Sequence, residues 1–188
     1  MAHFSEDDVY PVTRITAGSI GEPGRRIFIL QAQIGGSLVS WVIEKDHAVA
    51  LTRAIPRLLS DIREQYPELA EPLVAHRPNL NLVVPLSPEF RVGSIGLGYD
   101  RIHDLVVLTL EDGGQDAGES QDGAEGDEGS SETHLYTTRG QALLLGRQSE
   151  QVVTAGRQTC PNCGQPIDDY GHFCALDGLG RRTGGFVH

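Results

Sequence analysis

Three cysteines and one histidine near the C-terminal end have the residue types and spacing that metal chemistry requires. Cys160 and Cys163 form a Cys-x-x-Cys pair followed by Gly164, a tight turn in which backbone N–H groups point at the thiolates. Two such thiolates supply half of a tetrahedral zinc shell. His172 and Cys174 are the strong candidates for the other half, because both lie within reach along the chain. The sequence therefore predicts one structural zinc ion bound by Cys160, Cys163, His172 and Cys174.

Three other interpretations of the cysteines compete with structural zinc. A redox pair is expected at the start of a helix that follows a strand, where the helix dipole lowers the thiol pKa, whereas this pair follows a predicted helix. A catalytic zinc keeps an open position beside a general base, whereas a bound His172 closes the shell. Chance leaves unexplained why all three cysteines fall within fifteen residues. We favour structural zinc over a redox pair, a catalytic zinc or a chance cluster.

The acidic residues are concentrated in one segment. The chain of 188 residues has a formal net charge of −11, but nine of its carboxylates lie in Glu111–Glu132, which contains no Lys or Arg. The rest has 17 acidic against 15 basic residues and is nearly neutral, so we expect no nucleic-acid partner. Because the segment consists mainly of Gly, Ser, Gln, Ala and acids, it is predicted to be a disordered acidic loop over residues 112–132.

Nothing in the sequence suggests a membrane protein. The longest apolar runs, 27–30 and 105–110, stop far short of the roughly 20 residues that span a bilayer. Residues 1–10 are polar and acidic and lack the basic and apolar regions of a secretory signal. Clustered cysteines without a disulfide framework indicate a reducing compartment. We therefore expect a cytoplasmic protein that does not contact a membrane.

The elements that precede the cysteines are predicted to occur in the same order twice. Gly18-Ser-Ile-Gly21 recurs as Gly93-Ser-Ile-Gly96, 75 positions later. Alternating apolar residues followed by helical spacing predict three strands and a helix in each half. The predicted strands are 12–20, 26–34, 38–43, 90–99, 102–110 and 134–137, and the predicted helices are 46–66 and 138–155. We predict an α+β fold of two similar βββα repeats with antiparallel sheets, plus a small C-terminal zinc-ribbon-like knuckle.

The predicted domain boundaries follow from these elements. Pro56 lies inside the first predicted helix and is expected to kink or divide it, and Gly156 is the expected stop of the second. The proposed divisions are a duplicated body over residues 1–156, with repeat one over about 12–66, a Pro-rich connector over 67–88 and repeat two over about 89–156, and then a zinc knuckle and tail over 157–188.

Other motifs give little support for catalysis. Gly93–Gly98 has the glycines of a dinucleotide-binding loop, but no helix follows it. Ser94 is not in a nucleophile elbow, and His47, His76 and His103 have no matched catalytic partners in the sequence. We predict no catalytic residue and no bound organic cofactor. As a hypothesis, the two Gly-Ser-Ile-Gly segments line a shared groove between the repeats.

Several short motifs occur in a specific order along the chain. They are Gly18-Ser-Ile-Gly-Glu-Pro-Gly24, Phe28-Ile-Leu-Gln-Ala32, Glu44-Lys45, Phe90-Arg-Val-Gly93, Ala155-Gly-Arg157, Cys160-Pro-x-Cys-Gly-x-Pro166 and Gly171-His-x-Cys174. On these motifs the chain resembles an uncharacterised actinobacterial family, domain-of-unknown-function family 3090, over nearly everything except the acidic loop. The resemblance implies the zinc ligands Cys160, Cys163, His172 and Cys174, and it implies no activity.

Three classes of function are compared on this basis. The leading hypothesis is a non-enzymatic binding or adaptor protein with a protein partner, because a structural zinc and an acidic loop supply surfaces. The alternative is an enzyme or enzyme subunit with a small-molecule site in the groove between the two repeats. Nucleic-acid binding through the knuckle is weaker, because Gln165–Tyr170 is acidic rather than basic.

Overall fold

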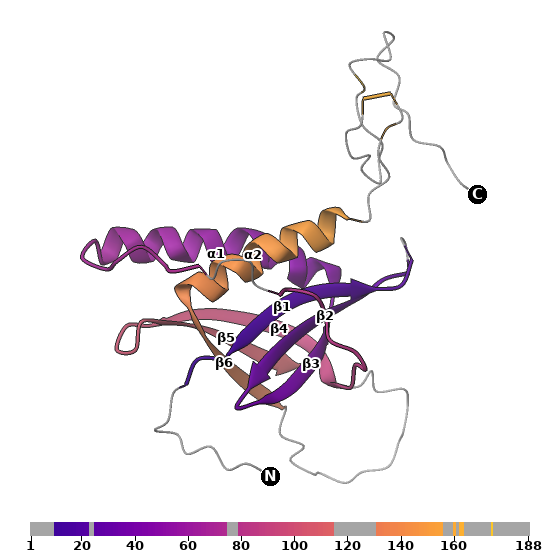
Figure 1. The fold of residues 1–188 in the computed structure, drawn as a ribbon, viewed down its shortest axis with the longest axis horizontal. Coiled ribbons are helices and arrows are strands. Elements are labelled where there is room, and N and C mark those ends of the chain that lie inside the picture. Colours follow the sequence, from indigo (N-terminus) through magenta and orange to yellow (C-terminus); the bar gives the residue numbers. More distant parts are fainter. Residues whose placement is uncertain are drawn as a thin grey trace.

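Two helices lie across one face of a curled sheet (Figure 1). The structure is a computed structural model that describes residues 10–22, 25–74, 79–114, 131–155, 160, 162, 163 and 174. The elements in chain order are β1 (Arg14–Ile20), β2 (Ile27–Ile34), β3 (Ser37–Ile43), α1 (Lys45–Gln65), β4 (Pro88–Asp100), β5 (Leu105–Asp112), β6 (Glu132–Thr138) and α2 (Arg139–Thr154). Neither of these helices is long and apolar enough to cross a membrane.

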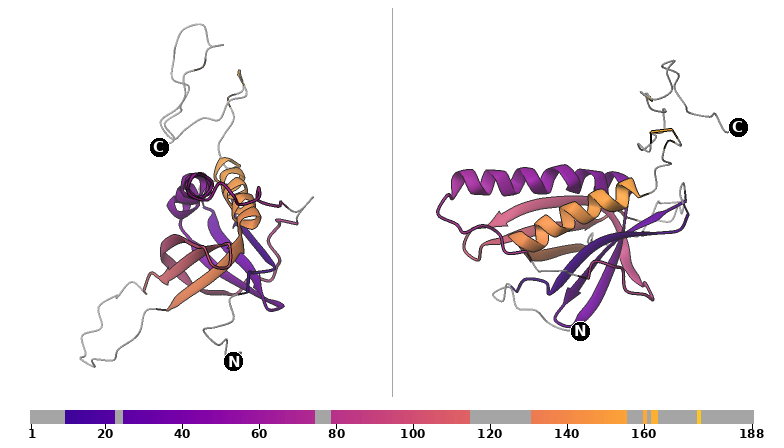
Figure 2. Two further views of the ribbon diagram at one scale, coloured as in Figure 1. Left: turned by 90° about the vertical axis from the view of Figure 1, so that its left-hand side faces the viewer. Right: turned by 45° about the horizontal axis from the view of Figure 1, so that its top comes forward.

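The strands form one six-stranded mixed sheet in the order β1-β2-β3-β4-β5-β6. Neighbouring strands are antiparallel except β3 and β4, which pair in parallel through a short ladder that includes Ser40 and Pro88. The sheet curls until its edges meet, since the N–H of Val12 donates to the carbonyl of Tyr136 at 2.8 Å. Figure 2 shows this curl from two further sides. The antiparallel sheets that the sequence predicts are thus joined into one sheet by a parallel pair.

Each helix begins where a side chain satisfies a backbone group. The Thr138 hydroxyl accepts a hydrogen bond from the backbone N–H of Gln141, and the Gln141 side-chain oxygen accepts one from the backbone N–H of Thr138. This reciprocal pair is a capping box. The Gln141 amide also donates to the carbonyl of Val12 at 2.7 Å. In α1, the N–H of Glu44 donates to Nδ1 of His47 at 3.2 Å. The cap of α2 therefore also holds the chain that leads into β1.

The apolar face of α1 packs on the sheet as its spacing predicts. Ala48, Leu51, Ile55 and Ile62 are buried, which is the period expected for one helix face. Pro56 lies within α1 and does not divide it. The core that α1 and α2 cover includes Ile15, Ala17, Leu30, Ala32, Trp41, Ile43, Val106, Leu108, Leu110, Leu135, Ala142 and Leu145.

The connector between α1 and β4 runs over residues 66–87, because β4 already begins at Pro88. Its described residues after position 78 lie on the face of the sheet opposite the helices. The Thr16 hydroxyl donates to the carbonyl of Leu80 at 2.6 Å. The Gln31 side chain donates to the carbonyl of Val83 at 3.0 Å and accepts the N–H of Val83 at 2.9 Å. Thr16 and Gln31 are completely buried, so these bonds replace the water that both side chains lose on folding.

Arg139 links the start of α2 to two distant segments. Its guanidinium donates to both carboxylate oxygens of Asp104 at 2.7 and 3.0 Å and to the carbonyl of Ala70 at 2.8 Å. The hydroxyl of Tyr99 donates to the same carboxylate at 2.7 Å. Burial alone raises the pKa of Asp104, but the bonds from Arg139 and Tyr99 and the charge of Arg139 outweigh it, so the pKa is lowered. Burial and the bond to Asp104 raise the pKa of Tyr99 to about 12, which keeps this hydroxyl a donor.

The predicted order of strands and helices is confirmed, and the bounds differ by a few residues. β5 begins at Leu105 rather than at position 102, because residues 101–104 form the turn that follows β4. Much of the predicted acidic loop, the helix stop at Gly156 and most of the knuckle and tail lie outside the described residues. The division of the chain into domains stays a prediction.

The first prediction concerns Gly140, where the connector passes the start of α2. A Cβ at position 140 would lie 1.8 Å from the carbonyl oxygen of Leu73, so backbone would have to move. We expect Gly140→Ala to lower the free energy of unfolding by about 1–3 kcal/mol, measured by urea denaturation. Gly98→Ala is the control, since no heavy atom lies within 4 Å of its Cβ position. Equal stability of Gly140→Ala and wild type would contradict this packing.

The second prediction concerns the pH dependence of the Asp104–Arg139 pair. Because the pKa of Asp104 is lowered in the folded protein, the pair stabilises the fold above the ordinary carboxyl pKa. The stabilisation is lost as the pH falls through the lowered value. Asp104→Asn should therefore unfold more easily than wild type at pH 7, by about 1–3 kcal/mol, and the difference should shrink below about pH 4.

Asn is the suitable replacement because Asp104 has a φ of 54°, a conformation that Asn also tolerates. Denaturation of both proteins from pH 3 to pH 8 makes the comparison. A difference that stays constant over this range would show that the carboxylate charge contributes nothing.

Candidate metal centre

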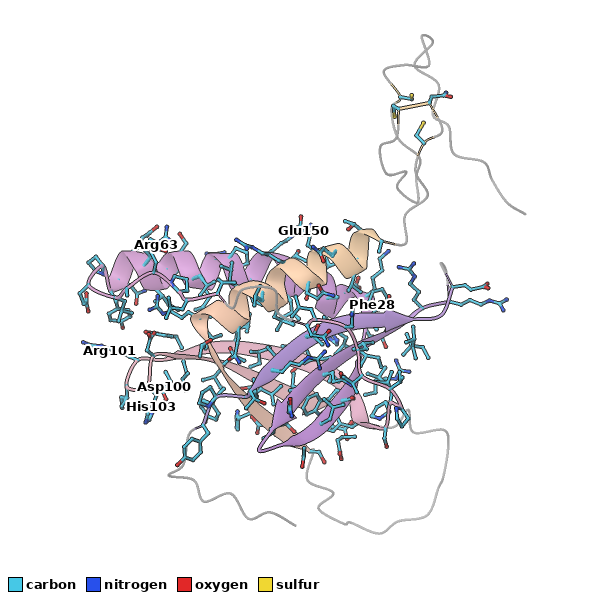
Figure 3. The ribbon with its side chains drawn as sticks, viewed as in Figure 1. Phe28, Arg63, Asp100, Arg101, His103 and Glu150 are labelled. Carbon is cyan, nitrogen blue, oxygen red and sulfur yellow. The ribbon has the colours of Figure 1, made fainter. Side chains whose placement is uncertain are left out.

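The structure brings together the three cysteines of the predicted zinc site. The Sγ atoms of Cys160, Cys163 and Cys174 all lie within 4.8 Å of one another, and those of Cys160 and Cys174 are 3.8 Å apart. None of the three forms a disulfide, and Cys160 and Cys174 are buried while Cys163 is partly exposed. Figure 3 shows their sulfur atoms as one yellow group. We refer to these residues as the cysteine triad.

The spacing of the triad fits a tetrahedral thiolate shell. With Zn–S bonds of about 2.3 Å at tetrahedral angles, two ligating sulfurs lie about 3.8 Å apart. The separation of Cys160 and Cys174 has this value, whereas a disulfide would need about 2.05 Å. Soft thiolates select zinc and similar metals over the hard ions Mg²⁺ and Ca²⁺. The cysteine triad can therefore supply three ligands to one metal ion.

The turn of the Cys-x-x-Cys pair prepares Cys160 to act as a ligand. The backbone N–H of Cys163 donates to the sulfur of Cys160 and is the largest cause that lowers the pKa of the Cys160 thiol to about 7. Burial opposes this shift, whereas the N–H of Asn162 and the thiols of Cys163 and Cys174 add to it. A thiol must lose its proton before it binds a metal. The lowered pKa thus favours the thiolate form of Cys160, which is the form that binds a metal.

The fourth predicted ligand, His172, lies outside the described residues, as does Gly164. The assignment of His172 and the closed four-ligand shell therefore stay predictions. The triad itself was visible in the sequence, because its members are close along the chain and have the spacing of a metal knuckle.

The histidines of the described body make local structural contacts. His103 Nδ1 lies 2.6 Å from Oδ2 of Asp100 in the turn between β4 and β5, where Figure 3 shows both side chains at the edge of the molecule. His47 caps α1, and its Nε2 lies 3.2 Å from the carbonyl oxygen of Gly93. His76 lies outside the described residues. These contacts give His47 and His103 structural roles in the cap of α1 and in the β4–β5 turn.

The Gly-Ser-Ile-Gly segments have packing roles in the structure. A Cβ at Gly18 would lie 2.5 Å from the side chain of Leu82, and a Cβ at Gly93 would lie 2.5 Å from the Cα of Gly113. Each glycine therefore permits a close approach of another part of the chain. Among the described residues, neither segment is part of the lining of the pocket described next, and the hypothesis that the two segments form a shared groove stays a prediction.

A pocket between the two halves lies elsewhere and was missed in the sequence. It opens between the ends of β2 and β5 and the starts of β3, β4 and β6, and its lining includes Trp41, Glu89, Phe90 and Asp112. These residues are far apart along the chain and share no motif, so only the folded sheet reveals them. Trp41 is almost fully buried beside this pocket, at 1% exposed.

The fold and the triad define an α+β protein with two helices on a six-stranded mixed sheet and a cysteine cluster able to hold a metal ion. A family profile described as "Protein of unknown function (DUF3090)" matches residues 8–174. The chain belongs to this family. Neither the search of curated proteins nor the search of solved structures found a match.

The third prediction is that the triad binds one soft divalent metal per chain. Co²⁺ should give the visible and thiolate-to-metal absorption bands of a tetrahedral site, and Zn²⁺ should remove them. Cys163→Ser should weaken Zn²⁺ binding more than about tenfold, since even the loss of an outer-shell partner costs this much.

Asn162→Ser is the matched control, because Asn162 supports Cys160 through its backbone N–H and the variant keeps all three thiols. Octahedral Co²⁺ spectra, or equal Zn²⁺ affinity in Cys163→Ser and Asn162→Ser, would contradict a shared thiolate site.

Proposed function

We propose that the protein is a cytoplasmic zinc-binding protein whose metal is structural and whose body is a non-enzymatic binding or adaptor module. One observation carries the proposal: three thiol sulfurs lie within 4.8 Å of one another. Such a cluster of thiols without a disulfide is typical of a metal site in a reducing compartment. Zn²⁺ is the metal that best suits cysteine and histidine ligands in a tetrahedral shell.

The proposed shell is Cys160, Cys163, His172 and Cys174, arranged as a small ribbon-like knuckle. A shell of four protein ligands leaves no position for water or substrate, which separates a structural from a catalytic zinc. The metal then links Cys160 to Cys174, which are fourteen positions apart along the chain, and its binding free energy becomes folding free energy for this segment.

We further propose that the body is a duplicated βββα unit. The order of three strands and a helix occurs twice, and this order supports the repeat proposed from the Gly-Ser-Ile-Gly segments. The acidic segment and the surface of the body are the surfaces that we propose for a protein partner. An enzyme or enzyme subunit is the second candidate, favoured by the pocket between the halves.

The fourth prediction tests the proposed ligand set. Native mass spectrometry of the full chain should find one zinc ion, and His172→Ala should weaken zinc binding more than about tenfold. His103→Ala is the matched control, because His103 contacts Asp100 in a turn of the body and should leave zinc binding unchanged.

Circular dichroism of the same samples would show whether the knuckle loses structure when a chelator removes the metal. Zinc affinity in His172→Ala equal to that of wild type would exclude the histidine as fourth ligand. A stable full chain that binds no zinc would refute the structural role.

A further inference from the structure

A pocket of about 360 Å³ lies where the two halves of the sheet diverge. Ile34 and Val39 line it from the first half, and Phe90 and Thr133 line it from the second. Pockets of about 300–1,000 Å³ are typical of small-molecule sites. The size therefore suits a small metabolite rather than a peptide or a macromolecule.

Carboxylates line this pocket, and none of its described lining residues is basic. Glu89 and Asp112 are the two acidic lining residues. Within the part of the chain that the structure describes, neither has a basic partner at ion-pair distance. The local potential is therefore negative, which attracts cations and repels anions.

The wall beside the carboxylates is aromatic and aliphatic. The ring of Phe90 is partly buried against the core, and its centroid lies 6.5 Å from that of Trp41 at an interplanar angle of 65°. Aromatic faces attract ammonium groups. Ile34 and Val39 offer contact to alkyl substituents. An occupant that combines positive charge with apolar groups matches this lining better than a strongly hydrated ion.

Trp41 adds a hydrogen-bonding requirement. It lines the pocket and is 1% exposed, and its indole N–H has no acceptor among the described residues. A buried donor without an acceptor is unfavourable. An oxygen atom on an occupant of the adjacent pocket can supply that acceptor.

A divalent metal ion fits this pocket less well than an organic cation. In the described ranges, the only group of three or more side chains with metal-binding geometry is the cysteine triad. Mg²⁺ and Ca²⁺ need about six to eight oxygen ligands, whereas much of this lining is apolar.

We propose that this pocket binds a small organic cation, an amine or quaternary ammonium compound that carries an oxygen acceptor. The proposal deepens the binding role proposed above and rests on it. Glu89 and Asp112 supply the charge, Phe90 supplies an aromatic wall, and Ile34 and Val39 contact the alkyl groups. The occupant is held between the two halves of the body.

The fifth prediction uses choline chloride as the probe and the fluorescence of Trp41, the single tryptophan of the chain, as the readout. Choline should change the emission in a saturable way at constant ionic strength, set with NaCl. The neutral isostere 3,3-dimethylbutan-1-ol has the same shape and hydroxyl group without the charge. It should need at least about tenfold higher concentration, since it gains neither ion pairing nor cation–π attraction.

Variants locate the binding in this pocket. Glu89→Gln and Asp112→Asn should each weaken choline binding about three- to fivefold, as expected for the loss of one partly exposed charge partner. Glu64→Gln is the matched control, because Glu64 is an exposed carboxylate on α1 that does not line the pocket. It should bind choline as wild type does.

Three results would overturn the proposal: no saturable response to choline, an equal response to the neutral isostere, or wild-type affinity in both Glu89→Gln and Asp112→Asn. The zinc proposal is judged separately by metal stoichiometry. Zinc binding without choline binding in the wild-type chain would refute only the pocket proposal. Choline binding without zinc binding would refute only the zinc proposal.

Discussion

The parallel pairing of β3 with β4 is the constraint on which the rest of the fold depends. A tight turn cannot join parallel neighbours, so the chain must travel back from the end of β3 to the start of β4. α1 carries it in one direction, and the connector returns it past Gly140 of α2 and over the outer face of β1–β3. The helices lie over one face of the curled sheet, and the connector lies on the other face of its first strands. The parallel pairing of β3 with β4 thus explains why the connector passes α2 and why it makes polar contacts with the first strands of the sheet.

The same pairing explains why a pocket exists between the halves. The parallel ladder is short and its register shifts between Ser40 and Val42, so β3 and β4 are in register over little of their length. The strands diverge on one side of this ladder, where Val39 and Phe90 face the open space. At the opposite edges the sheet is closed by the bond from Val12 to Tyr136. The sheet is therefore barrel-like. It is closed where the chain before β1 bonds to β6, and it is open beside the short β3–β4 ladder.

Periodicity in the sequence was sufficient to predict the elements but not their neighbours. The alternation in β2 and the spacing of Leu51, Ile55 and Ile62 predict a strand and a helix, because each pattern reports which side of an element is buried. Neither pattern specifies the partner strand, and the parallel join of β3 to β4 was missed. The cysteine triad was predicted correctly because its members are close along the chain. The pocket residues come from several strands, so no local pattern could reveal them.

The buried polar face beneath the connector has a consequence for the newly made chain. Thr16, Gln31 and Ser40 lie on strands that are complete well before residues 79–83 leave the ribosome. Until the connector arrives, their hydroxyl and amide groups face water, which solvates them well. Isoleucine or valine at these positions would instead expose apolar surface, which promotes association between partly folded chains. The hydrogen-bonded cover thus replaces an apolar surface with side chains that water can solvate before the connector packs on them.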